Sequence, residues 1–199
     1  INSTSVPAWT ILLASAHLKR PVIMDSAGTG IPAAQTNGNF VVSRFAMPIG
    51  GTAGQPTTED MRWRGYRELK VDEIRQLAEA IVRQVKLRGP FRSLGEFINR
   101  RLAASSDEKA LYGALQAALE DPKVDINKDY RDKTLTASDI KDTKYAFKQA
   151  ALGQRYQGTP AYISQADILQ PIAPIINARS DTFLIRTYGE SLAPDGKTV

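Results

Sequence analysis

The chain has 199 residues, of which 42% are hydrophobic and 24% charged, proportions typical of a globular protein with one or two domains. Its formal charge of +5 permits contact with an anionic partner but does not require one, because basic and acidic residues are interleaved. It contains no cysteine, which excludes disulfides, thiolate metal sites and a cysteine nucleophile, and no apolar run in it approaches the ~18 residues of a membrane helix.

The first predicted element is a short helix over residues 5–17. Ser5 can cap it, and Trp9, Leu12 and Leu13 form an apolar stripe. The helix is followed by a segment of different character.

Residues 19–65 are rich in glycine and proline, and their strand candidate is Phe40 to Val42. This segment is predicted to be an irregular insertion between helical parts, with room for one hairpin. Long irregular loops are usually functional or disordered, so the insertion is also a candidate for a specific contact surface.

The clearest element is a helix over residues 72–88. Apolar residues recur there at helical spacing on one face, and charged residues occupy the other. Asp72 and Glu73 in the first turn suit the helix dipole, and Gly89-Pro90 ends the helix. The predicted apolar face consists of Ile74, Leu77, Ala78, Ile81, Val82 and Val85.

Three capping signals predict further helices, which open at the pairs Ser93–Glu96, Ser105–Glu108 and Thr136–Asp139. The second of these helices is predicted to stop at Pro122 and the third near Gly153. Their apolar faces are Leu94, Phe97, Ile98 and Leu102 in the first, Leu111, Leu115, Ala118 and Leu119 in the second, and Ile140, Phe147 and Ala151 in the third.

The last third is predicted to hold a short helix and a strand. Ser164 caps a helix kinked by Pro171, and alternation over residues 182–188 places Phe183 and Ile185 on one strand face. The turn signal "PDG" at residues 194–196 precedes only three residues, and the chain begins without Met. We therefore expect a fragment whose other sheet strands, and any export signal or membrane anchor, lie outside it.

The predicted fold class is α+β and mostly α. Residues 1–160 form a helical-hairpin domain interrupted by the 19–65 insertion. Residues 161–199 are a short helix plus the start of a small, incomplete C-terminal β element.

No catalytic, cofactor-binding or metal site is predicted. His17 is the only histidine, and no G-x-S-x-G elbow accompanies it. Ser138 to Lys141 matches S-x-x-K, but the companion motifs of that enzyme class are missing. A catalytic role for these residues is therefore not expected.

One stretch superficially resembles a calcium loop, because Asp125, Asn127 and Asp129 alternate. Tyr130 and Thr136 stand where such a loop needs glycine and a bidentate glutamate. A solvated charged loop is the preferred interpretation, with metal binding as the alternative.

Basic residues gather around the Gly-Pro break: Arg88, Arg92, Arg100 and Arg101, with Lys86 nearby. They support two hypotheses. In the first, the arginines form salt-sensitive, sequence-independent contacts with nucleic-acid phosphates. In the second, they lie on the solvent-exposed face of two packed helices and bind no partner. The modest charge of the whole chain favours the second hypothesis.

Two stretches, "INSTSVPAWTILL" and "LKVDEIRQLAEAIVRQVKLRGPFRSLGEFINRRL", resemble the opening and the second half of helix-hairpin-helix modules. A third, "RSDTFLIRTYGE" with "DGKTV", is similar to a segment that returns the chain to the sheet of pilin-like proteins. Together they cover roughly half the chain. Their order looks most like the minor pseudopilin K family of type II secretion and the pilin-like envelope proteins called Verru_Chthon cassette protein A.

The resemblance implies a helical domain inserted into a pilin-like fold, with Ser180, Phe183 and Ile185 on the returning strand. Two features of the families are missing from this sequence. The G-h-G hairpin that contacts DNA phosphate is replaced by residues 19–65, and the N-terminal hydrophobic pilin helix is not present. The calcium binding of the pseudopilin family cannot be carried over, because no ligand residue matches.

The expected function is therefore structural and not enzymatic: a component of a pilin-like or secretion-associated apparatus of the cell envelope, on its periplasmic or extracellular side. Its expected partners are other pilin-like or secretion-apparatus subunits, without cofactor or small-molecule substrate. Residues 82–102 would hold the domain together through Ile81, Val85, Phe91, Phe97 and Ile98. The alternative is a nucleic-acid-binding helical module, and a hydrolase with an unrecognised site is the third possibility.

Overall fold

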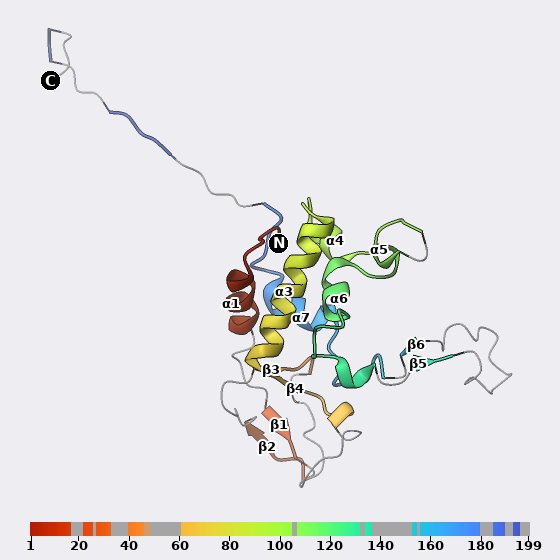
Figure 1. Cartoon of the computed structure of the whole chain (residues 1–199). Coiled ribbons are helices and arrows are strands. Elements are labelled where there is room, and N and C mark those ends of the chain that lie inside the picture. The colour runs from red at the N-terminus through yellow and green to blue at the C-terminus, as the bar shows by residue number, and fades with distance from the viewer. Residues whose placement is uncertain are drawn as a thin grey trace.

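A computed structural model of the chain is mostly helical, which confirms the predicted mostly α fold class, and its described residues include three short antiparallel strand pairs (Figure 1). It describes residues 1–16, 22–25, 27–32, 40–45, 47, 61–104, 107–131, 134–136, 153–154, 156–179, 185–189 and 193–195.

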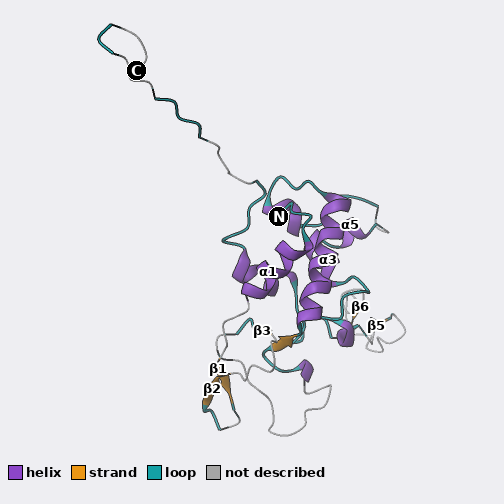
Figure 2. Cartoon of the chain, turned by 60° about the vertical axis from the view of Figure 1, so that its left-hand side comes forward, coloured by secondary structure: helices purple, strands orange, loops and turns teal. Residues whose placement is uncertain are grey.

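The long helix α3 (Val71–Arg88) is the centre of the fold. It packs against α1 (Val6–Ala16) and α6 (Ala114–Leu119), and α7 (Gln165–Ile172) packs against both of these partners. The turned view shows α1 and α5 on either side of α3 (Figure 2). All six residues of the predicted apolar face of α3 are buried, so the helical periodicity is confirmed.

Helix α3 ends where the sequence predicts. The N–H of Gly89 bonds to the Val85 carbonyl at 2.8 Å, and the cis Gly89-Pro90 peptide turns the chain away. Phe91 then enters the core, where its ring meets that of Phe97 edge to face at 5.2 Å. The break therefore folds the chain back into the domain.

Within its described residues, the insertion contains a hairpin and a strand that pairs with a strand beyond residue 65. Strand β1 (Val22–Met24) pairs with β2 (Gly30–Pro32), and Gly28 in the turn has a φ of +80°, which favours glycine. Strand β3 (Phe40–Val42) pairs with β4 (Arg67–Leu69), just before α3. The predicted strand at residues 40–42 is thus confirmed. The third pair joins β5 (Thr134–Leu135) to β6 (Gly153–Gln154).

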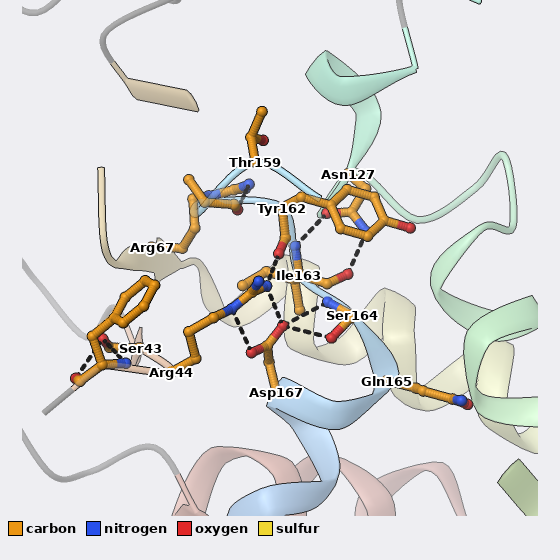
Figure 3. Close-up of polar contacts among 12 residues, drawn as sticks. Ser43, Arg44, Arg67, Asn127, Thr159, Tyr162, Ile163, Ser164, Gln165 and Asp167 are labelled. Carbon is orange, nitrogen blue, oxygen red and sulfur yellow. Dashed lines mark hydrogen bonds and ion pairs between the residues drawn. The ribbon is translucent and has the colours of Figure 1, made fainter. Parts of the chain in front are cut away.

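A polar network ties β3 and β4 to the segment that leads into α7 (Figure 3). The Arg44 guanidinium donates to both carboxylate oxygens of Asp167, at 3.0 and 2.7 Å. Asp167 also accepts from the N–H and the hydroxyl of Ser164, so the predicted cap of α7 is present. The Arg67 guanidinium donates to the carbonyls of Ile126 and Ala161. This part of the insertion is therefore fixed to the helical core.

The helix opened by Ser93 is shorter than predicted. Helix α4 (Leu94–Ile98) ends at Asn99, whose extended backbone turns the chain outward. Ser93 accepts from the N–H of Glu96 as expected, but the Glu96 carboxylate reaches the N–H of Arg92, one residue before the expected one. Leu102 consequently lies beyond the helix and is fully exposed, so its predicted core position was wrong.

The predicted continuous helix up to Pro122 was also wrong, because two short helices occupy its place. Asp107 caps α5 (Glu108–Leu111), and α6 begins only after Gly113. A Cβ atom at Gly113 would lie 1.9 Å from the carbonyl oxygen of Ile98, so the start of α6 rests directly on the backbone that ends α4. This close packing of two backbones interrupts the helix.

Gly113→Ala is expected to destabilise the protein by at least the ~1–3 kcal/mol typical of overpacked cores, because the neighbouring atom is backbone and cannot rotate away. Urea unfolding would measure the change. Gly95→Ala in α4 is the matched control, since its Cβ would meet only side-chain atoms at ordinary distances. Equal stability of the two variants would contradict this account of the helix break.

Two predicted elements remain outside the observed secondary structure. Most of the helix expected between Thr136 and Gly153 lies outside the described residues. Residues 185–189 form no strand, and they are exposed. A strand needs a neighbour for its backbone groups, and no described strand reaches this segment. Phe183 and Ser180 lie outside the described residues, so a returning strand there stays a prediction.

Candidate functional site

The start of the chain meets the segment after α7 at Asn2. Its side-chain amide donates to the carbonyls of Phe91, at 2.8 Å, and Ala178, at 2.9 Å. Its side-chain oxygen accepts from the N–H of Phe91 at 2.7 Å. The nitrogen of Ile1 also donates to the carbonyl of Asn177. Residues 1–2 therefore lie next to residues 177–178, and we call this contact the Asn2 clamp.

A groove that we call the arginine groove is lined by residues from the end of α3 and from α4. Figure 1 shows that this end of α3 lies opposite the end near β3 and β4. The groove has a volume of about 940 Å³. The Gly-Pro break forms part of its lining, and four arginines surround it. Its lining residues are Arg88, Gly89, Pro90, Arg92, Ser93, Gly95, Glu96, Asn99, Arg100, Arg101 and Leu102.

Two of the four arginines stabilise the walls of the groove. Arg88 is buried, donates to the Tyr112 carbonyl at 2.7 Å and forms an ion pair with Glu108 at 3.5 Å. Burial lowers the pKa of the Arg88 guanidinium, and the charge of Glu108 opposes that effect. Arg101 donates to the Arg88 carbonyl at 2.9 Å and lies 5.5 Å from the Phe91 ring. Arg88 therefore holds the domain together and is not free to contact a phosphate.

The other two arginines face solvent. The Arg92 side chain is 85% exposed and pairs with Glu96 at 2.8 Å. The hydrogen bond from the Arg92 backbone N–H, followed by that from its side chain, lowers the pKa of Glu96. Arg100 is exposed, and its side chain forms no hydrogen bond or ion pair with the described part of the chain. Its charge is thus available to a partner.

An apolar patch continues the groove. A second hollow, of about 400 Å³, is lined by Arg100, Arg101, Leu102, Ala103, Ala110 and Leu111. Leu102 is completely exposed and Leu111 is 57% exposed. We call these two side chains the leucine shelf. Arginines and large apolar side chains therefore lie side by side on one surface.

The structure brings together the four arginines that the sequence singled out, and it separates their roles. The leucine shelf was missed, because the helical spacing of Leu102 and Leu111 predicted that both are core. The only sign of it in the sequence is that Leu102 follows directly after two arginines. His17, Ser138 and Lys141 lie outside the described residues.

The calcium-like loop is organised around a buried amide. The Asn127 side chain donates to the Ile163 carbonyl at 2.7 Å and accepts from the Ile163 N–H at 3.1 Å. The Asp125 carboxylate instead accepts a hydrogen bond from the Gln76 side-chain amide and forms an ion pair with Lys128. Within the described ranges, no group of three His, Cys, Asp or Glu side chains lies close enough together to hold a metal ion.

Among the described residues, no helix combines the length and the apolar character needed to cross a membrane. No family model matches the chain, and comparisons with curated proteins and with solved structures found no match.

Proposed function

We propose that this chain is a structural, non-enzymatic part of a pilin-like or secretion-associated envelope apparatus. In this proposal the helical domain predicted over residues 1–160 also takes in α7, which packs against α1 and α6, and the whole unit is inserted into a pilin-like fold and packs against other subunits. The observation that carries the proposal is the Asn2 clamp, because an inserted domain must enter and leave its host at neighbouring points. The segment "RSDTFLIRTYGE", which resembles pilin-like proteins, begins directly after Ala178. An inserted domain would end there, and the chain would return to the host fold.

The packing of residues 82–102 supports the same proposal. Val85, Phe91 and Phe97 are buried in the core, and Ile98 is partly buried against it. The helical hairpin thus uses its apolar side chains to build the domain. Its outer surfaces remain for other proteins.

Excision of the helical domain tests the insertion. In the full-length protein, residues 3–176 would be replaced by a short Gly-Ser linker, which the adjacency of Asn2 and Asn177 makes feasible. We expect the shortened protein to accumulate and to resist proteolysis, because the host fold loses only a side domain. Degradation of the shortened protein, with normal levels of the full-length protein, would contradict the insertion.

Thiol labelling tests the location. These 199 residues contain no cysteine, so Ile11→Cys places the domain's one thiol at an exposed site on α1, and the parent protein without the substitution gives the background labelling. We expect a membrane-impermeant maleimide to label it when only the outer layers of the cell are opened. Labelling that requires lysis of the inner membrane would place the domain in the cytoplasm and overturn the envelope assignment.

The arginine groove keeps nucleic-acid binding as the second candidate. We expect any such binding to be non-specific and salt-labile, with a Kd no tighter than ~10⁻⁴–10⁻⁶ M at physiological salt. Fluorescence anisotropy with a labelled duplex, titrated across salt, would measure it. Submicromolar binding at ~150 mM salt, abolished by Arg92→Ala together with Arg100→Ala, would favour the nucleic-acid module.

A further inference from the structure

We infer that the arginine groove and the leucine shelf together dock a short acidic segment of a partner protein that also carries a large apolar side chain. This inference rests on the proposed function and deepens it, because it gives the partner a chemical description. It depends on three observations: an excess of positive charge, an adjacent apolar surface and a fixed groove wall.

The charge of the site is unbalanced. Arg92 and Arg100 are exposed, and so is Arg101 although its side chain bonds to the Arg88 carbonyl, whereas Glu96 is the only carboxylate among the described residues that line the groove. Glu96 is already paired with Arg92, which leaves the charges of Arg100 and Arg101 without a carboxylate partner in the described part of the chain. A guanidinium binds a carboxylate through two parallel hydrogen bonds, so a segment with two or more acidic side chains matches this surface.

The leucine shelf decides between classes of partner. The exposed side chains of Leu102 and Leu111 lie in the same hollow as Arg100 and Arg101. A nucleic-acid backbone offers phosphates to the arginines but no apolar group to the leucines. A peptide can offer both, and the buried core of a protein interface is more apolar than the rest of the surface and enriched in arginine. The combination therefore favours an acidic peptide with an apolar anchor.

The surface is already formed before a partner binds. The N–H of Arg101 bonds to the Lys109 carbonyl at 2.7 Å, and its side chain bonds to the Arg88 carbonyl. The buried Arg88 in turn donates to the Tyr112 carbonyl. A groove fixed in this way loses little conformational freedom on binding, which favours affinity for a short segment.

Peptide binding to the purified 199-residue chain tests the inference. The probes are three fluorescein-labelled peptides of equal length: one alternating Glu with Leu, one with Gln in place of Glu, and one with Ser in place of Leu. A labelled DNA duplex is the fourth probe. Fluorescence anisotropy is recorded at low salt and at ~150 mM salt. We expect the Glu/Leu peptide to bind at least ~10-fold more tightly than either substituted peptide.

Two variants locate the site. Arg100→Glu and Leu102→Ser change exposed side chains that have no packing role, so both proteins are expected to unfold at the same denaturant concentration as the parent. Each should weaken binding of the Glu/Leu peptide by at least ~10-fold. The matched controls are Lys123→Glu, with the same charge change beyond α6, and Ile11→Ser, with the same polarity change on α1. Neither control should alter binding.

Several results would overturn the inference. Failure of the Glu/Leu peptide to bind, or equal loss in the variants and their controls, would remove the groove as a docking site. Equal binding of the Glu/Ser peptide would reduce it to a general anion patch, and tighter binding of the duplex would assign it to nucleic acid. None of the peptide results bears on excision or thiol labelling, so the docking site can fail while the proposed function stands.

Discussion

Phe97→Ala is expected to lower the free energy of unfolding by about 3–5 kcal/mol, the range for removing a large aromatic side chain from a core. The Phe97 side chain is fully buried. Its ring stacks on Trp9 with centroids 6.0 Å apart and meets Phe91 edge to face. The substitution removes contacts to α1 and to the segment after the Gly-Pro break at once, so little of the cavity can collapse. Denaturant unfolding followed by tryptophan fluorescence would measure the loss.

The control for this prediction is Leu102→Ala. The sequence placed both residues on one helix face, but Leu102 is fully exposed and should change stability by no more than ~0.5 kcal/mol. An unfolding midpoint unchanged by Phe97→Ala would contradict the packing of α4 against α1. A large loss for Leu102→Ala would show that the exposed leucine is packed after all.

Asn127→Ala is expected to cost about 2–6 kcal/mol, because it leaves two buried backbone groups of Ile163 without partners at ~1–3 kcal/mol each. Asn127 is fully buried, and its amide joins the loop after α6 directly to the segment that leads into α7, beside the bridge that Arg67 makes between Ile126 and Ala161 (Figure 3). Thermal or urea unfolding would measure the change, and hydrogen exchange at the Ile163 amide should become faster in the variant.

Asn99→Ala is the matched control, because Asn99 is exposed and its side chain forms no hydrogen bond within the described residues. It should lie within about 0.5 kcal/mol of the parent. A similar small effect at Asn127 would mean that water replaces the amide, and that the loop does not depend on this residue.

Periodic elements of the fold could be predicted from the sequence. Helix α3 could be predicted from its apolar spacing, its acidic first turn and the Gly-Pro stop, because all three signals are local to the helix. The break before α6 could not be predicted in this way. It depends on contact between Gly113 and the backbone of Ile98, and local spacing does not reveal which backbone lies next to a glycine. The capping signal at Ser105 was misleading for a related reason, because Asp107 is an equally good cap two residues later.

The candidate site was predictable in composition but not in function. Arginines close together in sequence remain close in space, so the cluster itself could be found. Whether each arginine faces water depends on tertiary structure. Because α5 ends at Leu111, the carbonyl of Tyr112 has no partner in a continuing helix, and the buried Arg88 side chain donates a hydrogen bond to it. Arg100 has no such acceptor and stays outside. The break between α5 and α6 exposes Leu111 at the end of α5. Helical periodicity assumes an unbroken helix and therefore could not predict the leucine shelf.

The Asn2 clamp also determines how the protein responds to mechanical force. A pull on the chain across Asn2 and Ala178 acts first on the hydrogen bond between these two residues and on the neighbouring bond from Ile1 to Asn177. While these hold, tension passes from one end to the other without stretching α1, α3 or the aromatic core. The helices are therefore shielded from tension applied between these two points, and Asn2→Ala, which removes the Asn2 bond to Ala178, would pass more of that tension through the core.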